Sequence, residues 1–377
     1  MSDRSVLLVV SGNSYAPGIW THHTAALWRE TAREFSSVHV FARSTAQRFW
    51  HGSMENVHVH LIPRGPARML TFFVTSWWLP MILIKVRPAY IQAQSPVHGG
   101  LACIVWGRLL GIPVMLELHG EHYVRGGQVG GPIHKWFIRP LTSLAFHGAT
   151  RIRSLSSEMT QEISALYGAS ARRKIVEIPN RVDLGVFSPP KSSYSATAPL
   201  NLVSVGALNA NKNQLNLIRD LSETGGNYSL TLVGDGPLRQ ELVAEGQRLG
   251  LSVTVTGLLT HSQLRAVLQQ HDVYVHYSHS EAVSRAILEA MAMGLPVVVA
   301  PGGFMGGVIE PGVNGLRLAE KGPAPLREAL DTLDNALVRE QMGTAARERI
   351  ETQHEWKRVF ALHAAAVKRM RCGTSRT

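Results

Sequence analysis

Two glutamates, Glu281 and Glu289, have the residue type and the spacing best suited to chemistry in this sequence. They lie in residues 278–300, where a short apolar run leads through a polar turn into a helical pattern that begins at about Ser284. Serine is favoured at the start of a helix, so Glu281 is expected just before the helix and Glu289 about one turn inside it. Glu281 alone would be interpreted as a solvated turn residue, but its context favours a functional role.

The start of this helix is also a candidate anion site. Gly294, followed by Pro296, predicts where the helix ends. The backbone N–H groups near Arg285 and Ala286 would then be unpaired donors at the positive end of the helix dipole, which is an arrangement that binds phosphate. The segment therefore indicates a phosphate site with one carboxylate on either side of it.

Other kinds of catalytic site lack their motifs in this sequence. There is no P-loop, and Gly234-Asp-Gly236 lacks the third glycine of the dinucleotide fingerprint. No Gly-x-Ser-x-Gly elbow is present. An Asp-x-Asp pair and a His/Cys cluster are absent too, so neither a divalent metal nor another cofactor is expected.

The elements that must position these residues alternate between short apolar runs and helical patterns, which predicts parallel βαβ units. In the first half, the expected strands are residues 5–10, 38–41, 58–62, 90–93, 114–118, 151–155 and 175–178. In the second half, they are residues 200–205, 229–233, 253–256, 273–276, 297–300 and 316–318.

This alternation predicts an α/β protein of two Rossmann-like, doubly wound parallel-sheet domains that face a central cleft. The expected domains are residues 1–188 and 200–355, because residues 188–199 are rich in Pro, Ser, Ala and Lys and resemble a linker. A helix is expected at residues 356–371, and it could pack back on the first domain. Ligands in such sheets bind beyond the carboxyl ends of the strands.

Composition limits the compartment and the partners. A chain with 45% hydrophobic and 17% charged residues folds, and its two distant cysteines indicate a reducing compartment without disulfides. The net charge of +11 calls for an anionic partner: nucleic acid, a membrane surface or a phosphorylated substrate. Nucleic acid is the weakest of the three, because no basic arm or zinc-finger spacing is present.

Residues 69–84 are apolar, contain Trp77 and Trp78, and hold no charged residue. The stretch is shorter than the roughly 20 residues that span a bilayer. Cations flank it within residues 64–87, so a helix lying in the interface of an anionic membrane is favoured over a buried core helix, with Pro80 complicating both interpretations.

The spacing of the two glutamates resembles the retaining GT-B glycosyltransferases of sequence family 4, the glycosyl transferases group 1. Glu281, seven intervening residues, Glu289 and then Ala-Met-Ala-x-Gly-x-Pro-Val-Val carry the most specific part of this resemblance. Weaker pieces follow in the family's order: Ser95-Pro-Val-His-Gly, Leu118-His-Gly, Ile178-Pro-Asn-Arg-Val-Asp, Val205-Gly-Ala-Leu with Lys212-Asn-Gln, Leu232-Val-Gly-Asp-Gly-Pro, and Asn314-Gly.

The resemblance implies a role for each matching residue. Glu289 would bind the ribose hydroxyls of a nucleotide-diphosphate sugar, since a carboxylate can accept hydrogen bonds from both hydroxyls of a diol. Glu281 would face the transferred sugar, and Lys212 would contact the diphosphate and support the leaving group. His119 would project toward the sugar. The remaining implied donor-binding residues are Gly18, Gly206, Ser284, Arg285 and Ala286.

Some of these positions have plainer alternatives. Lys212 could be an ordinary surface lysine, and His119 could be a satisfied histidine at a strand end. Glu117, His122 and Tyr123 are polar neighbours that no motif singles out. The scattered histidines are expected to be structural, namely His147, His276 and His279.

The sequence also departs from the family pattern. Ala207 stands where the family commonly has an arginine, and Lys212 cannot reproduce the bidentate contact of a guanidinium. Arg285 or Arg181 could compensate, and Val283 changes the pocket where the family has phenylalanine.

The resemblance therefore predicts a retaining, metal-independent glycosyltransferase that acts on a glycan or lipid-linked acceptor in cell-surface polysaccharide or lipopolysaccharide synthesis. It would be cytoplasmic and peripheral on the inner face of the cell membrane, and it would not bind nucleic acid. A degenerate GT-B subunit that binds the donor without efficient transfer is the alternative. A periplasmic-type binding protein is less favoured, because it should carry an export signal and would have no use for the two glutamates.

Overall fold

The computed structural model of the chain describes residues 5–18, 22–46, 48–63, 70–118, 136, 138–194, 199–305 and 307–372, without the side chains at 22–25, 70–76, 98 and 372. The chain divides into two compact units. Unit 1 comprises Met1–Ile178 and Phe360–Thr377, and unit 2 comprises Pro179–Val359.

Unit 1 is built on a sheet whose eight described strands follow the order β3-β4-β2-β1-β5-β6-β7-β8. Neighbouring strands are parallel except for β3 and β4. The strands are β1 (Val6–Tyr15), β2 (Ser37–Ser44), β3 (Trp50–Met54), β4 (Val57–Pro63), β5 (Tyr90–Ala93), β6 (Val114–Glu117), β7 (Arg151–Ser154) and β8 (Ile175–Glu177). The helices are α1 (His22–Ala32), α2 (Leu70–Val86), the π-helical turn η1 (Pro96–Gly100), α3 (Leu101–Leu109), α5 (Arg139–Gly148), α6 (Ser157–Arg172) and the larger part of α13 (Trp356–Cys372).

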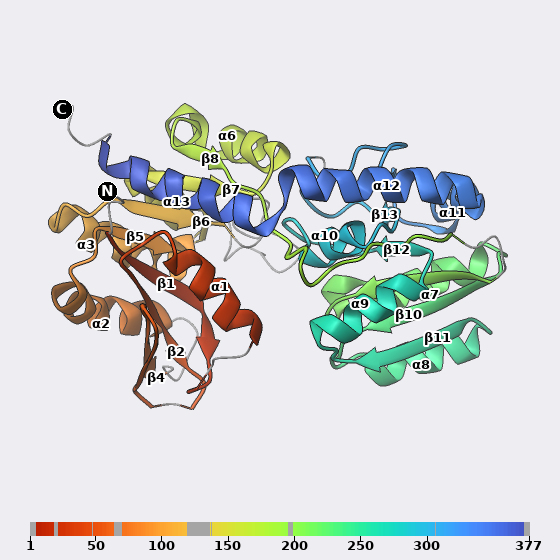
Figure 1. Cartoon of the computed structure of the whole chain (residues 1–377), viewed down its shortest axis with the longest axis horizontal. Coiled ribbons are helices and arrows are strands. Elements are labelled where there is room, and N and C mark those ends of the chain that lie inside the picture. Colours follow the sequence, from red (N-terminus) through yellow and green to blue (C-terminus); the bar gives the residue numbers. More distant parts are fainter. Residues whose placement is uncertain are drawn as a thin grey trace. The chain divides into compact units, whose positions relative to one another are not determined.

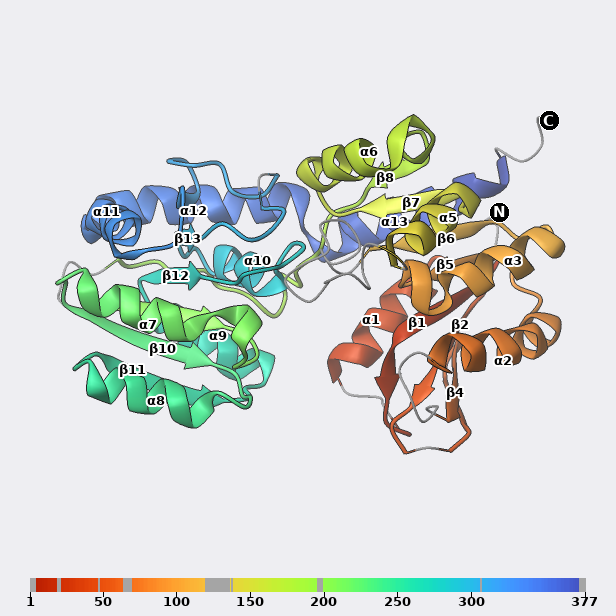
Figure 2. The same cartoon turned by 180° about the vertical axis from the view of Figure 1, so that it is seen from behind.

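Helices cover both faces of this sheet, with α1 and α13 on one face and α2, α3 and α5 on the other (Figures 1 and 2). Alternate side chains of a strand point to opposite faces. On β2 and β4 the valines and Leu61 join the core with α1 and α13, while the histidines of the same strands point to the opposite face. A buried parallel sheet of this kind matches the fold class expected from the apolar runs.

Strand β3 was not expected from the sequence. It pairs antiparallel with β4 through a two-residue turn, in which Glu55 has a positive φ of 54°. The residues of Trp50–Met54 include a histidine, a glycine and a serine, so the strand lacks the run of β-branched residues that marks the others.

Helix α2 contains the apolar stretch and holds Pro80 inside it. Leu79 and Leu83 are fully buried, whereas Trp77 is 78% exposed. The helix is therefore neither wholly buried nor wholly apart from the core. No helix in the described part of the chain is long and apolar enough to cross a bilayer.

Unit 2 is built on a parallel sheet whose six described strands follow the order β11-β10-β9-β12-β13-β14. The strands are β9 (Leu200–Val205), β10 (Tyr228–Val233), β11 (Ser252–Gly257), β12 (Val273–His276), β13 (Val297–Val299) and β14 (Gly315–Arg317). The helices are the 3-10 turn η4 (Ala210–Lys212), α7 (Gln214–Glu223), α8 (Arg239–Arg248), α9 (His261–Gln270), α10 (Arg285–Ala292), α11 (Pro323–Asp334) and α12 (Ala336–Gln353). Leucines of α7, α8 and α11 pack on β9, β10 and β12 to form the core of this unit.

The expected linker belongs to unit 2, which corrects the predicted boundary at residue 188. The ammonium of Lys191 lies 3.2 Å from the carboxylate of Asp272, and both side chains are nearly buried. The hydroxyl of Tyr194 donates to the carbonyl of Gly294 at 2.5 Å. These contacts hold the described part of the segment against unit 2, whereas a composition rich in Pro and Ser suggested a free connection.

Candidate functional site

The site in unit 2 begins at the carboxyl end of β12, where the chain turns toward α10. The backbone N–H of Glu281 donates to the carbonyl of Gly302 at 2.8 Å, and Glu281 forms an isolated bridge with Gly303. A Cβ on Gly302 would lie 2.3 Å from the carbonyl oxygen of Ser278, so only glycine permits this close approach. The turn that carries Glu281 is thus held by a second turn after β13.

Lys212 reaches the same place from the turn after β9. Its backbone N–H is capped by the side chain of Asn209 at 3.1 Å. A Cβ on Gly206 would lie 3.1 Å from Cε of Lys212, so the bare glycine leaves room for the lysine side chain. The Lys212 ammonium forms an ion pair with Oε2 of Glu281.

The two turns are also joined through their backbones. The N–H of His279 donates to the carbonyl of Asn211 at 2.8 Å, and the Asn211 side-chain amide donates to the carbonyl of Ser280 at 2.9 Å. Since the lysine and glutamate side chains remain 19% and 25% exposed, the ion pair is held in place and still open to a ligand.

Glu289 lies on α10 and is partly buried. Burial raises the pKa of its carboxyl to about 7, against a smaller lowering effect of Arg285. Desolvation of this kind disfavours the ionised form. A carboxyl group whose pKa is raised to near 7 is typical of a functional site.

The N-terminus of α10 is where the sequence placed it, but its cap differs from the expectation. Ser284 occupies the N-cap position with extended φ and ψ, and its side chain makes no capping hydrogen bond. Ser284 is buried, while Arg285 is exposed and Ala286 is intermediate. The helix ends as predicted, with Gly294 at a φ of +77°.

His276 is a neighbour of the pair that the sequence interpretation treated as structural. It is the last residue of β12, is 4% exposed, and places Nε2 at 3.9 Å from Oε2 of Glu281. Burial, followed by the charges of Lys212 and Lys321, lowers the pKa of His276 to about 3. The available sequence signal was its position at the carboxyl end of a strand, where such sheets bind ligands.

Other predicted residues belong to unit 1, contact a different side chain, or fall outside the described structure. His119, with His122 and Tyr123, falls outside the described residues. Gly18 belongs to unit 1, where it is exposed with a φ of +80°. Arg181 places its guanidinium 5.5 Å from the centre of the Trp356 ring.

Glu117 is a buried structural residue and not an exposed polar contact. Its carboxylate lies 2.7 Å from Arg153 and 3.2 Å from Nε2 of His363, and all three side chains are at most 8% exposed. His363 is on α13, so the carboxylate connects β6, β7 and that helix within unit 1.

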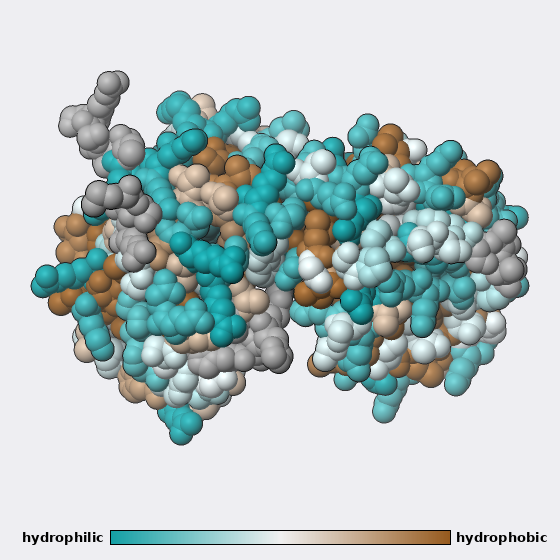
Figure 3. Space-filling view, viewed as in Figure 1, coloured by the Kyte–Doolittle hydropathy of each residue, from teal (hydrophilic) through white to brown (hydrophobic). Residues whose placement is uncertain are grey.

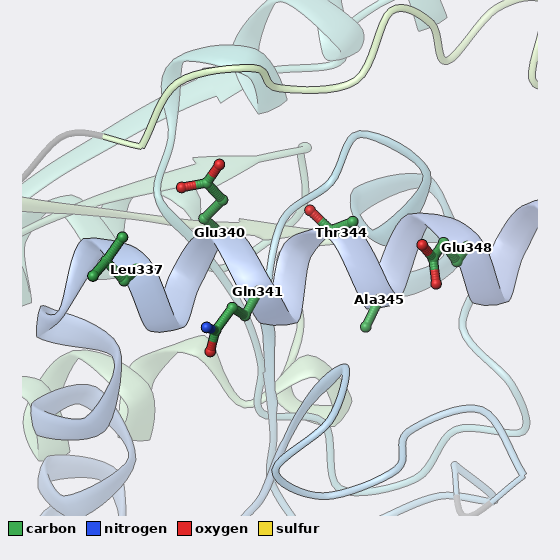
Figure 4. A pocket seen from close by; sticks show the side chains of 6 residues that line it. All are labelled: Leu337, Glu340, Gln341, Thr344, Ala345 and Glu348. Atoms are coloured by element: carbon green, nitrogen blue, oxygen red, sulfur yellow. The ribbon is translucent and has the colours of Figure 1, made fainter.

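No group of three or more His, Cys, Asp or Glu residues in the described ranges is arranged to hold a metal ion. A surface pocket lies along α12, and the side chains that line it are Leu337, Glu340, Gln341, Thr344, Ala345 and Glu348 (Figure 4). These six include two carboxylates and no cation, and none belongs to the group around Glu281.

Comparison with known proteins assigns the family. The model of the glycosyl transferases group 1 matches residues 190–349, and that of the glycosyl transferase 4-like domain matches residues 18–181. The chain belongs to the group 1 glycosyltransferases. The first match lies within unit 2, and the second covers most of the first segment of unit 1, so both units fall within the family.

Among curated proteins, the chain is similar to sulfoquinovosyl transferase SQD2 of Arabidopsis thaliana, at 26% identity over 73% of this chain and 55% of that protein. The chain thus aligns with about half the length of that relative. Among solved structures, it resembles sucrose-phosphate synthase from Thermosynechococcus elongatus with a TM-score of 0.81 at 16% identity, covering 98% and 100% of the two chains. It also resembles HepE of Anabaena in complex with UDP, with a TM-score of 0.74 at 16% identity, covering 97% and 99%. The glycosyltransferase therefore has the GT-B fold.

Proposed function

We propose that this glycosyltransferase binds a nucleotide-diphosphate sugar in unit 2 and transfers the sugar, with retention and without a metal, to a membrane-associated glycan or lipid-linked acceptor. The observation that carries the proposal is the contact of Lys212 with Glu281 beside the helix that bears Glu289. A cation for phosphate and two carboxylates for hydroxyl groups are the groups that such a donor requires.

Each residue has a role that its surroundings allow. Lys212 would move from Glu281 to the diphosphate and stabilise the charge that develops on the leaving group. Glu281 would then be free to accept from a hydroxyl of the sugar and to steady positive charge near the anomeric carbon. Glu289 would accept from the ribose hydroxyls, and the departing phosphate oxygen would assist deprotonation of the acceptor.

The resemblance to HepE, whose structure contains UDP, supports a nucleotide-linked donor. The first experiment is a thermal-shift screen of the whole chain against UDP-, GDP- and ADP-sugars. We expect one of them to raise the unfolding temperature of the wild type and to have little effect on Glu289→Ala. Glu328→Gln, which alters an exposed carboxylate on α11, is the matched control and should respond like the wild type. If no nucleotide sugar stabilises the wild type, or Glu289→Ala responds equally, the assignment of the site is wrong.

A membrane-bound acceptor is supported by charge. Unit 1 holds 22 Lys and Arg against 9 Asp and Glu, whereas unit 2 holds 16 against 18. The positive charge that looks scattered along the sequence therefore belongs to unit 1. No acidic residue occurs between positions 56 and 116, the stretch that contains α2 and α3.

The same unit exposes apolar side chains on adjoining helices. Helix α2 contacts α3, which in turn contacts α5. Their exposed large residues, here called the apolar patch, are Trp77, Met81, Ile84, Val105, Leu109, Leu141 and Leu144. Hydrophobic side chains gather at this edge of the molecule, over α2 and α3 (Figure 3). Contiguous apolar surface with cations and without acids fits the interface of an anionic membrane.

The membrane proposal predicts a location on the inner face of the cell membrane. Vesicle flotation tests the membrane binding on which that location depends. We expect the chain to float with vesicles that contain anionic lipid, and Trp77→Ser with Met81→Ser to weaken this binding. Leu258→Ser removes an equally exposed leucine from unit 2 and is the control. If the double variant floats as the wild type does, the apolar patch is not the surface that binds the membrane.

The alternative function is a degenerate subunit that binds the donor without efficient transfer, and Ala207 is the residue that favours it. Steady hydrolysis of the donor by the wild type, lost in Lys212→Met, would support an active enzyme. Tight nucleotide binding with no hydrolysis and no transfer to lipid-linked acceptors would support the degenerate subunit.

A further inference from the structure

His276 has a polar atom that the fold leaves unused. Its side chain is almost completely buried, and Nε2 has no hydrogen-bond partner among the residues that the structure describes. The hydroxyl of Ser278, which is 1% exposed, has none either. An unpaired buried donor costs stability, so two of them at the end of one strand call for an explanation.

The surroundings of His276 identify the charge that would satisfy it. Nε2 approaches Oε2 of Glu281 at 3.9 Å, and the ring stacks on that of Tyr274 with 6.4 Å between centres. The lysines whose charge acts on the imidazole are Lys212 and Lys321. Both lysines add positive potential at the imidazole, and this potential favours an added anion beside the ring.

Ala207 increases the need for a second donor to the phosphates. The turn after β9 carries no cationic side chain between Gly206 and Lys212, so the phosphate side of the site lacks a second donor from that turn. His276 reaches the ion pair from β12, the neighbouring strand of the sheet. It lies at the carboxyl edge, where parallel sheets bind their ligands.

We propose that His276 is the second phosphate-facing donor of this site and that Nε2 donates a hydrogen bond to the diphosphate of the nucleotide. This inference rests on the proposed function and adds to it a residue outside the family's motif. When the anion enters, it faces the imidazole from the side of Lys212 and Glu281. The hydrogen bond pairs the buried nitrogen and takes the place of the missing guanidinium.

A bound diphosphate changes the protonation of His276. In the free protein, burial and the two lysines keep the imidazole neutral, because they lower its pKa. A bound diphosphate adds negative charge beside the ring and so raises that pKa. A nearby opposite charge shifts a pKa by about 1 to 3 units, so from about 3 in the free protein the imidazole becomes partly protonated in the complex, and binding at about pH 5 is expected to take up protons.

Calorimetric titration of the whole chain with UDP, GDP and ADP, and with the corresponding nucleosides, tests the assignment. His276→Phe keeps a flat ring and removes the donors. We expect it to weaken the tightest nucleoside diphosphate by about tenfold or more, the effect of one charge-assisted hydrogen bond. Affinity for the nucleoside should stay unchanged, and His276→Gln, which retains a donor, should recover part of the loss.

Proton uptake separates a direct contact from a structural role. Titrations in two buffers of different ionisation enthalpy give the protons taken up. The terminal phosphate and Glu289, whose pKa is about 7, also titrate, and both are present in every variant. We expect the wild type and the control His147→Phe, in unit 1, to take up more protons than His276→Phe. Equal diphosphate affinity or equal proton uptake in wild type and His276→Phe overturns the inference. If no nucleotide binds the wild type, the proposed function fails first and this inference fails with it.

Discussion

Replacing Glu289 with glutamine should make the free protein more stable while it destroys the donor site. Burial raises the pKa of this carboxyl from its ordinary value of 4.5 to about 7. Below about pH 4.5 the group is protonated in the folded and unfolded states, and it costs nothing. As the pH rises toward 7, the Glu289 carboxyl ionises in the unfolded chain before it ionises in the folded protein. The folded protein therefore becomes progressively less stable relative to the unfolded chain.

The size of the pKa shift of Glu289 determines the expected change in the unfolding free energy. A difference of 2.5 between 4.5 and 7 corresponds to about 3 kcal/mol at neutral pH and above. Glutamine cannot ionise, so Glu289→Gln should avoid this cost. In a unit of this length, about 3 kcal/mol corresponds to roughly 6–12 °C in unfolding temperature.

Scanning calorimetry at about pH 5 and about pH 8 provides the assay, since these values lie near the two limits of the shift. We expect the variant to gain stability over the wild type at the higher pH and to gain much less at the lower one. Glu328→Gln again serves as the exposed control. A gain that does not depend on pH would refute the reasoning, because it would mean that ionisation of Glu289 does not oppose folding.

Three further perturbations test other parts of the structure. Glu117→Gln leaves the buried guanidinium of Arg153 without its counter-charge and should cost about 3 kcal/mol in urea unfolding; a cost below about 1 kcal/mol would match an exposed pair instead. Burial, with neighbouring histidines, lowers the pKa of His39 to about 4 and of His60 to about 3. The stability that these two neutral histidines contribute is therefore fully present above about pH 6.5, and it is lost as the pH falls toward those pKa values. The variant His60→Phe should lose less stability between about pH 7 and about pH 4 than the wild type, and an equal loss in calorimetry would contradict this. Lys212→Met should lower kcat about 100-fold in a transfer assay. Because its ion pair is partly exposed, the variant should change the unfolding free energy by less than about 1 kcal/mol, and a larger change would make Lys212 structural.

Most strands could be predicted because their apolar runs are themselves the buried interior of a parallel sheet. Tyr90–Ala93, Leu200–Val205 and Val273–His276 have the predicted bounds. β3 could not be recognised in the same way, because its pairing depends on a tight turn at Glu55 and not on its own hydrophobicity. A search for two-residue hairpin turns would have been the signal.

The candidate site could be predicted only in part. The motif places Glu281 and Glu289 on either side of a helix start, because that geometry is local to one strand, turn and helix. Lys212 meets Glu281 across 69 positions of sequence, so its contact was accessible only through the family resemblance. The place of His276 depends on the strand register and on the charges around it, and neither is visible in a single run of residues.

The two crossings of the chain between the units have a consequence for synthesis. Ala364, Val367 and Met370 of α13 are buried in the core of unit 1 beside Trp28 and Phe35. A ribosome makes them only after it has made the whole of unit 2, at about 5–20 residues per second. The core of unit 1 therefore keeps an open apolar surface while unit 2 is being made. A nascent chain stalled after unit 2 should accordingly be the form that chaperones and proteases recognise.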